Sequence, residues 1–164
     1  MRALVQRVTK GEVRVEGNVV ASIGNGIVVL LGVKKGDTEA NARELAGRCS
    51  NLRIFQDDEG KMNRSLCETG GSALVVSQFT LYADTRRGNR PGFSDAAPAE
   101  SAESLYLAFV RFLRSIVGEG NVATGVFRAM MDVTIVNSGP VTILLDDRAA
   151  DSSQSISGGS NDDD

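Results

Sequence analysis

Histidine is absent from this chain of 164 residues. Because histidine is the side chain whose ordinary pKa lies closest to neutral pH, its absence removes the commonest general base from any enzymatic mechanism. Chemistry in this protein must therefore use hydroxyl groups, backbone groups or a group that the substrate brings with it.

Cysteine and long apolar runs are also scarce. Cys49 and Cys67 are too few and too irregularly placed for a disulfide framework or a zinc site, and we interpret them as reduced packing residues. The longest apolar run, residues 27–32, is far too short to span a bilayer. Arginines at positions 2 and 7 interrupt any N-terminal signal sequence. These features predict a cytoplasmic protein that binds neither membranes nor metals.

Excess positive charge is absent as well. With 18 Lys and Arg against 21 Asp and Glu, the net charge is -3. This balance excludes indiscriminate binding of nucleic acids by the whole molecule, although local basic patches remain compatible with it. Residues 147–164 are rich in Ser, Gly and Asp, and this composition cannot offset the entropy of ordering. We therefore expect one folded domain over residues 1–146 and a disordered acidic tail over residues 147–164.

The folded part shows the periodicities of a mixed α/β domain. Apolar residues at helical spacing follow Thr38 and Pro98, which predicts two main helices. The run at residues 26–33 is apolar throughout and is flanked by glycine, as expected of a central strand buried on both faces. Residues 13–15 and 19–20 are typical of a hairpin with its turn at residues 17–18, and the remaining strand patterns lie at residues 3–8, 52–55, 73–76, 126–127, 131–136 and 141–145. Strands dominate, so we predict a single domain with a substantial sheet.

Polar side chains close the strand predicted at residues 73–76. Alternation would place Ser77 and Phe79 on one face and Gln78 and Thr80 on the other. A nucleophilic Thr80 would need an activating base, and no base stands in a recognisable arrangement with it. The local pattern alone favours a purely structural role. Ser77 and Thr80 are better suited to orienting a carbonyl or hydroxyl group by hydrogen bonds.

A second segment of interest contains Asn137, Ser138, Gly139 and Pro140. Proline inside a strand pattern is confined to edges, bulges and turns, and Gly-Pro is a turn signal. The segment by itself favours a hairpin turn between two strands. A cis peptide before proline would instead present neighbouring carbonyls in one direction as fixed hydrogen-bond acceptors.

Three arginines, Arg86, Arg87 and Arg90, lie in the long polar loop of residues 84–98. Such a charge run is usually a solvated loop, but arginines beside glycine can also contact phosphate groups. The turn at residues 60–65 lacks the spacing of a phosphate-binding loop, so nucleotide hydrolysis gains no support.

Taken together and in this order, the motifs resemble the D-aminoacyl-tRNA deacylase family. The resemblance covers residues 1–146 and is carried by the following segments: residues 6–8 (Gln-Arg-Val), 60–63 (Gly-Lys-Met-Asn), 77–82 (Ser-Gln-Phe-Thr-Leu-Tyr), 90–91 (Arg-Pro) and 137–142 (Asn-Ser-Gly-Pro-Val-Thr). Two separated hexapeptides with matching flanks are far more specific than either one alone.

The resemblance implies a sheet-rich single domain with two main helices on a mixed, barrel-like β-sheet, assembled as a homodimer. It implies hydrolysis of the ester between a D-amino acid and the 3′-terminal adenosine of tRNA, and of glycyl-tRNA mischarged on tRNA-Ala, as translation proofreading. No cofactor is implied. Gly139 and Pro140, flanked by Asn137 and Ser138, would enter the partner subunit's pocket. There their carbonyls would act as a chirality filter by binding the substrate amino group.

Catalysis is implied at Thr80, Ser77, Gln78 and Phe79, and the arginines of the long loop are candidate tRNA contacts. Two roles for Thr80 remain open, the nucleophile or a positioning group. An unactivated threonine is a poor nucleophile, whereas the 2′-hydroxyl of the substrate lies beside the ester at high effective concentration. Our hypothesis is that the substrate supplies the essential hydroxyl, while Ser77 or Phe79 backbone N–H groups stabilise the oxyanion.

This chain departs from the family pattern at two positions. Ser138 stands where the family often has Asp, and Arg128 stands where it commonly has Gly. Arg128 could narrow or recharge the rim of the pocket, or point to solvent. Two alternatives remain: a relative specialised toward a different mischarged tRNA, and a noncatalytic nucleic-acid-binding scaffold on the same fold.

Overall fold

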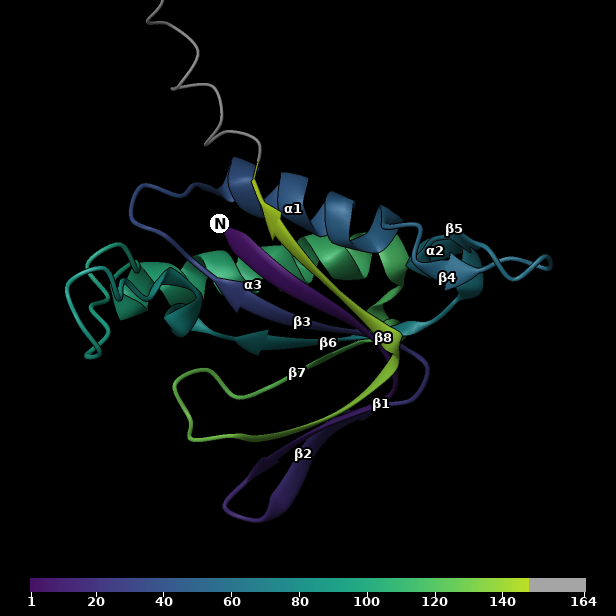
Figure 1. The fold of residues 1–164 in the computed structure, drawn as a ribbon, viewed down its shortest axis with the longest axis horizontal. Helices are drawn as coiled ribbons and strands as arrows, with labels where there is room; N and C mark the ends of the chain where they lie inside the picture. Colours follow the sequence, from purple (N-terminus) through teal and green to yellow (C-terminus); the bar gives the residue numbers. More distant parts are fainter. Residues whose placement is uncertain (148–164) are drawn as a thin grey trace, which may run out of the picture.

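The computed structural model describes residues 1–147 (Figure 1). Of the predicted tail, only Asp147 belongs to this part. Asp147 is buried and accepts a hydrogen bond from the Met1 amine, so the folded part reaches one residue past the predicted boundary. The other residues of that tail, 148–164, lie outside the described residues. None of the described helices is long and apolar enough to cross a membrane.

The described residues form a single α/β domain around one mixed sheet and a short two-stranded ribbon. The strands are β1 (Arg2–Val15), β2 (Asn18–Ile23), β3 (Gly26–Gly32), β4 (Phe55–Gln56), β5 (Met62–Arg64), β6 (Ser72–Ser77), β7 (Val122–Thr124) and β8 (Asp132–Asp146). The main sheet has the order β2-β1-β3-β6-β7, and β8 also pairs with β1. The sheet curls into the barrel-like form that the resemblance implies (Figure 1).

The register of this sheet is continuous across its centre. β1 runs antiparallel to β3 with Ala3 opposite Leu31 and Val8 opposite Gly26. β3 runs parallel to β6 with Leu31 opposite Ser77. The apolar run predicted as a central strand is β3, and most of its residues are buried, because strands lie on both sides of it and apolar residues cover both faces.

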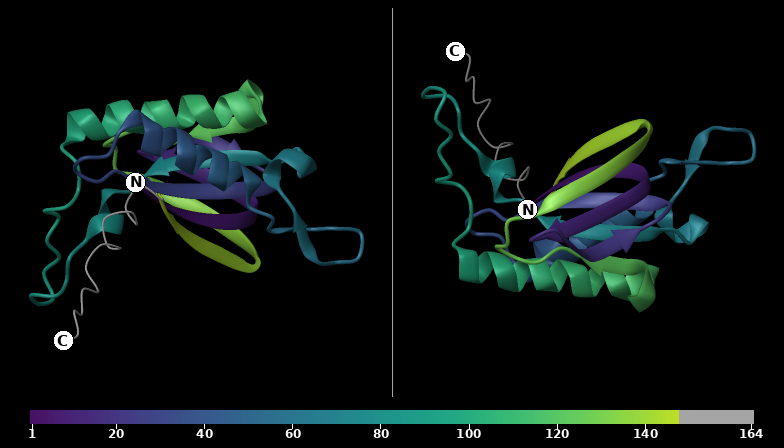
Figure 2. Two further views of the ribbon diagram at one scale, coloured as in Figure 1. Left: turned by 90° about the horizontal axis from the view of Figure 1, so that it is seen from above. Right: turned by 90° about the horizontal axis from the view of Figure 1, so that it is seen from below.

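Two helices, α1 (Glu39–Asn51) and α3 (Ala99–Val117), cover the same face of the sheet (Figure 2). α1 begins after Thr38, as predicted, and buries Ala42, Leu45, Ala46 and Cys49 at helical spacing. A short helix, α2 (Leu66–Thr69), precedes β6. The main core lies between these helices and the sheet. A smaller apolar cluster that includes Val8, Val28 and Leu74 fills the opposite, concave side.

Four local predictions were wrong. The strand predicted at residues 52–55 is the two-residue β4, and residues 52–54 lie outside it. Strand alternation does not continue past Ser77, because residues Phe79–Tyr82 form a 3-10 helix, η1. Residues 126–127 lie in a loop, and the strand there is β7, a few residues earlier. The two strands predicted around Pro140 are one strand, β8, so the segment between them is not a hairpin turn.

The proline segment of β8 is a large bulge. Gln6 of β1 pairs with Thr142, and Val8 pairs with Asn137, so the four residues from 138 to 141 lie opposite Arg7 alone. Bulges bend a strand and re-aim its side chains, and they accommodate a residue without an N–H group. The chain therefore keeps one antiparallel ladder with β1 while Gly139 and Pro140 project from it, both exposed.

Candidate functional site

The first predicted motif lies where β6 ends and η1 begins. The Gln78 backbone N–H donates to the Leu31 carbonyl at 2.8 Å, which is the last bond between this segment and β3. The chain then turns into η1, where the Leu81 N–H donates to the Gln78 carbonyl at 3.3 Å. This turn brings Phe79 and Thr80 out of the sheet, and Phe79 is 58% exposed.

A cavity of about 620 Å³ opens beside this turn. Its volume suits a small organic ligand or one end of a larger one. Its lining comes from β3, β6, α3, the long loop of residues 84–98 and the loop between β7 and β8. Among the lining residues are Ser77, Gln78, Phe79, Ala102, Tyr106, Phe127, Arg128, Ala129 and Met130.

Tyr106 of α3 lines this cavity and is held in place by a hydrogen bond to β6. Its buried hydroxyl donates a hydrogen bond of 2.9 Å to the Val75 carbonyl. Burial raises the pKa of Tyr106 to about 12. Tyr106 therefore acts as a neutral hydrogen-bond donor to the backbone at neutral pH, and sequence reasoning missed it because its partner lies 31 residues away.

The side-chain hydroxyl of Thr80 contacts an amide, and no basic group among residues 1–147 contacts it. The Gln78 side-chain N–H donates to the Thr80 hydroxyl oxygen. A carboxamide nitrogen is a donor without accepting capacity, so Gln78 orients the hydroxyl but cannot take its proton. Among residues 1–147, no group accepts a hydrogen bond from the Thr80 hydroxyl.

Two contacts hold η1 against the ends of β1 and β8. The Arg2 guanidinium donates to the Leu81 carbonyl at 3.0 Å and lies 5.1 Å from the centre of the Tyr82 ring. The same group donates to the Asp146 carboxylate at 2.7 and 3.3 Å. Arg2 therefore joins the candidate site to the sheet, a role that its place in the sequence does not reveal.

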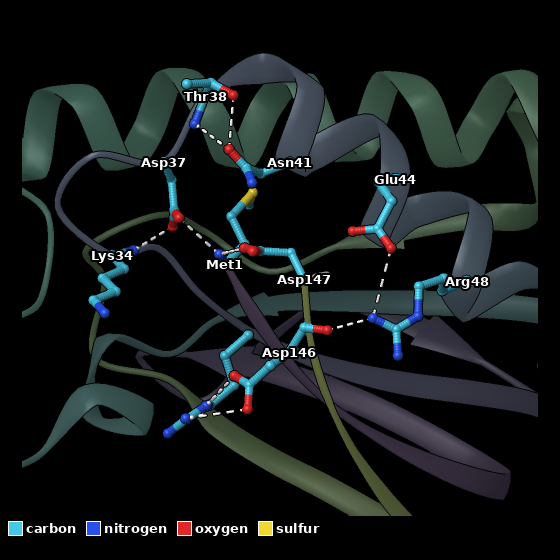
Figure 3. A network of polar contacts seen from close by, with 10 residues as sticks. Met1, Lys34, Asp37, Thr38, Asn41, Glu44, Arg48, Asp146 and Asp147 are labelled. Carbon is cyan, nitrogen blue, oxygen red and sulfur yellow. Dashed lines mark hydrogen bonds and ion pairs between the residues drawn. The ribbon is translucent and has the colours of Figure 1, made fainter. Parts of the chain in front are cut away.

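A network of polar contacts surrounds this end of the sheet (Figure 3). The Met1 ammonium donates to Asp37 at 2.8 Å and to Asp147, and the Asp37 carboxylate also accepts from the Lys34 N–H. Burial lowers the pKa of the Met1 amine below its usual value, and Asp37 opposes this shift. The contacts tie the starts of β1 and α1 to the end of β8.

The second predicted motif is held by Arg7. Its Nε donates to the Ser138 carbonyl at 2.9 Å, and its Nη1 donates to the Ile54 carbonyl at 2.5 Å. The Gly139-Pro140 peptide is cis, and Gly139 has a φ of 129°, which favours glycine. A Cβ atom at Gly139 would lie 2.7 Å from Arg7 Nη2. Arg7 and the bulge therefore fit one another closely.

Asn137 and Ser138 serve this bulge in different ways. The Asn137 side chain accepts from the Val141 N–H at 2.7 Å and donates to the Thr142 hydroxyl at 3.0 Å, so it bridges the base of the bulge. Ser138 contributes its carbonyl to Arg7.

The two motifs lie far apart within one chain. Ser77 pairs with Leu31, and Leu31 pairs with Ala3, whereas Gly139 and Pro140 lie opposite Arg7, four residues further along β1. At about 3.3 Å per residue, the two positions are roughly 13 Å apart along the strands. A single chain does not bring Gly139 and Pro140 to the cavity beside Ser77.

The arginines of the long loop differ in how they are engaged. Arg86 donates to both carboxylate oxygens of Asp84, at 2.9 Å each, and this pairing lowers the pKa of Asp84 to about 2. Arg87 and Arg90 have no partner among the described residues. Phe93 of the same loop packs edge-on against Phe79, with ring centres 4.9 Å apart. The loop therefore meets the candidate site through Phe93.

Comparisons with known proteins show the family to which this chain belongs. The family model of D-Tyr-tRNA(Tyr) deacylase matches residues 4–146. The chain is 60% identical to a D-aminoacyl-tRNA deacylase of Roseiflexus castenholzii, over 89% of this chain and 92% of that protein. It is 58% identical to a D-aminoacyl-tRNA deacylase of Anaeromyxobacter dehalogenans, over 90% and 98% of the two chains. The chain therefore belongs to the D-Tyr-tRNA(Tyr) deacylase family.

A solved structure supports the same fold. The structure described as a c-Myc DNA unwinding element binding protein has a TM-score of 0.86 and 41% identity to this chain. The match covers 89% of this chain and 98% of that one.

The two tyrosines provide a test of the packing around the site. Burial raises the pKa of both Tyr82 and Tyr106, that of Tyr106 to about 12, above the ordinary value of about 10. The folded state favours the neutral phenols, so this stabilisation is complete below about pH 10 and is lost as the pH rises through about 12. Because the chain has two tyrosines and no tryptophan, phenolate absorbance reports these groups alone.

We expect the folded protein to show little phenolate at pH values where urea-unfolded protein is half ionised. The measurement is an ultraviolet titration of both states, with circular dichroism to confirm folding. Ionisation of a full tyrosine equivalent near its ordinary pKa in the folded protein would contradict this packing.

Proposed function

We propose that this protein hydrolyses the ester bond of D-aminoacyl-tRNA and so releases the D-amino acid and reusable tRNA. The observation that carries the proposal is the match of nearly the whole chain to the deacylase family, including both hexapeptides. A cavity of about 620 Å³ beside Ser77 and Phe79 supports it, because one terminal nucleoside ester fits a space of this size. The role is proofreading of charged tRNA, and we assign it to the cytoplasm.

In the proposed mechanism, water adds to the ester carbonyl carbon, the bond from this carbon to the 3′-oxygen breaks, and the 3′-oxygen takes up a proton. The 2′-hydroxyl of the terminal ribose lies next to the reacting oxygen and relays this proton. No base among residues 1–147 contacts Thr80, so Thr80 positions the substrate together with Gln78. The Ser77 or Phe79 backbone N–H stabilises the oxyanion, whereas the Gln78 N–H between them already donates to the Leu31 carbonyl.

We also propose that the active unit is a homodimer in which Gly139 and Pro140 of one subunit complete the cavity of the other. The separation of roughly 13 Å along the strands between Ser77 and the Gly139-Pro140 segment supports this arrangement, since one chain cannot bring them together. The exposed bulge and the exposed apolar residues Val136 and Leu144 of β8, at 46% and 51%, provide surface for such a contact.

This arrangement has consequences for substrate choice. The backbone of Gly139 and Pro140, in a bulge that Arg7 holds through the Ser138 carbonyl, excludes an L-side chain by collision and need not recognise a D-side chain, so a broad range of D-amino acids is accepted. Glycine has no side chain to exclude. We therefore include glycyl-tRNA mischarged on tRNA-Ala among the substrates.

A second candidate function is nucleic-acid binding without hydrolysis. The observation in its favour is the 41% identity to a protein described as binding a DNA unwinding element. Such a module would need neither the cavity nor the fitted contact between Arg7 and the bulge.

Purified protein should hydrolyse D-aminoacyl-tRNA at least about 100-fold faster than the L form of the same aminoacyl-tRNA, because backbone collision is costly. The measurement is release of radiolabelled amino acid from each enantiomer, with buffer alone as the control. Binding of tRNA with no hydrolysis of either enantiomer would instead favour the nucleic-acid-binding module.

Subunit complementation tests the proposed dimeric site. Ala129→Trp should block the cavity, and Gly139→Ala should displace the bulge by its contact with Arg7. Each variant alone should be inactive, while an equimolar mixture refolded together should recover about a quarter of wild-type activity, from one intact site in each mixed dimer.

Gly36→Ala is the matched control for Gly139→Ala, because Gly36 also has a positive φ, of 87°, but faces open space. It should retain full activity. Mixed dimers without any recovered activity would mean that the two motifs do not act across subunits.

Substrate and enzyme changes together separate the two roles of Thr80. A substrate ending in 2′-deoxyadenosine should be hydrolysed about 10²–10⁴-fold more slowly, since proton relay contributes a factor of this size. Thr80→Ala should lose only about tenfold, as expected of a positioning group, and Thr69→Ala should lose nothing. Single-turnover rates measure both effects. A fully active deoxy substrate, combined with an inactive Thr80→Ala variant, would make Thr80 the nucleophile.

A further inference from the structure

Arg128 stands out because its backbone conformation is one that side chains rarely adopt. Its φ is 64°. Among the described residues other than glycine, only one more has a positive φ, Glu16 in the turn between β1 and β2. The Ala129 N–H donates to the Val126 carbonyl at 3.2 Å, so Arg128 is the third residue of a tight turn. Glycine is the usual residue where that position needs a positive φ. The chain carries arginine there despite the strain.

The charge of Arg128 is also unmatched. Ten of the 13 arginines in residues 1–147 contact a carboxylate, a carbonyl or an aromatic ring. The other three, Arg87, Arg90 and Arg128, have no such partner among these residues. An exposed guanidinium that is free of carboxylates keeps all its donors for an anion from outside.

The position of Arg128 limits what that anion can be. Among the lining residues that belong to the described part of the chain, 1–147, Arg128 is the only charged one, and it is exposed in the loop between β7 and β8. The remaining lining is apolar or uncharged. A ligand that fits both features has an uncharged body inside the cavity and an anionic group at its mouth. A nucleoside followed by a phosphodiester has this form.

We propose that Arg128 is a specificity-determining residue that binds the phosphodiester joining the last two nucleosides of the RNA substrate. The inference deepens the proposed function and rests on it for the identity of the substrate. Arg128 thereby lets the cavity distinguish the end of an RNA strand from a free nucleoside ester. It contacts no reacting atom, so it contributes to binding and leaves the chemical step unchanged.

The test compares two probes that carry no amino acid, adenosine and the dinucleotide cytidylyl-(3′→5′)-adenosine, in titrations followed by nuclear magnetic resonance. Wild-type protein should bind the dinucleotide about tenfold more tightly, as expected for one charge-assisted contact. Arg128→Gln should lose this preference and leave adenosine affinity unchanged, and Arg128→Lys should retain part of it. Arg111→Gln, which removes an exposed arginine from α3, is the matched control and should bind both probes as the wild type does.

A second variant separates binding from folding. Arg128→Gly should raise the melting temperature by about 3 °C, because it relieves the positive-φ strain, while it loses the dinucleotide preference. With D-aminoacyl-tRNA, both Arg128→Gln and Arg128→Gly should raise KM about tenfold at unchanged kcat. The dependence of log KM on log salt concentration should also fall by about 0.7, the value for one phosphate of a single strand.

The outcomes distinguish this inference from the proposed function. Equal affinity of the wild type for both probes, or a preference that survives in Arg128→Gln, would overturn the role of Arg128 even if D-aminoacyl-tRNA is hydrolysed. A dinucleotide preference that depends on Arg128, in a protein without hydrolytic activity, would support Arg128 as a phosphodiester contact and reject the proposed hydrolysis.

Discussion

The antiparallel ladder between β1 and β8 is the constraint on which the rest of the site depends. It holds Leu145 beside Ala3 and Asn137 beside Val8, and β3 and β6 continue these rows across the sheet. Because each residue advances a strand by about 3.3 Å, the register alone determines where Ser77 and the bulge lie. Bringing them together in one chain would break the ladder. Their separation is therefore a property of the backbone, independent of side-chain conformation.

The ladder is interrupted opposite Arg7, and Arg7 also stabilises the interruption. A bulge removes carbonyls from the ladder, and partly buried carbonyls need other donors. The Arg7 guanidinium supplies one to the Ser138 carbonyl of the bulge, and it also donates to the carbonyl of Ile54, which lies outside β8. A fixed fork of donors orients its acceptors more strictly than an ammonium group would. The residue that satisfies the hydrogen bonds of the bulge thus also determines its direction.

Local patterns in the sequence were enough to predict α1 and β3. The spacing of Ala42, Leu45 and Cys49 forms one helix face, and the run at residues 26–33 has no polar side chain. Alternation failed after Ser77, because the bond from Gln78 to Leu31 ends the ladder and the next residues turn into η1. The proline signal in β8 was correctly seen but wrongly interpreted, since a bulge accommodates proline as well as a turn does.

The contacts that sequence reasoning missed join residues far apart in the chain. Arg7 and Ser138 are 131 positions apart, and Arg2 and Leu81 are 79 positions apart. The periodicity of a local segment cannot predict contacts between residues so far apart in the sequence. The family resemblance did identify both hexapeptides, because it draws on whole motifs in order. It implied that the two motifs meet across subunits, and the register of the sheet separates them within one chain.

The composition of the cavity lining indicates which groups the protein and the substrate each contribute to the proposed reaction. Apart from the charge of Arg128 at its mouth, the lining of the cavity is uncharged, and the nearest partner of Thr80 is an amide. The protein then offers shape and fixed backbone dipoles, and the substrate offers the reactive hydroxyl. Fixed carbonyls suit a chirality filter, because a flexible side chain could move to admit either enantiomer. A site that acts mainly through backbone groups therefore needs no histidine, which agrees with the absence of histidine from the sequence.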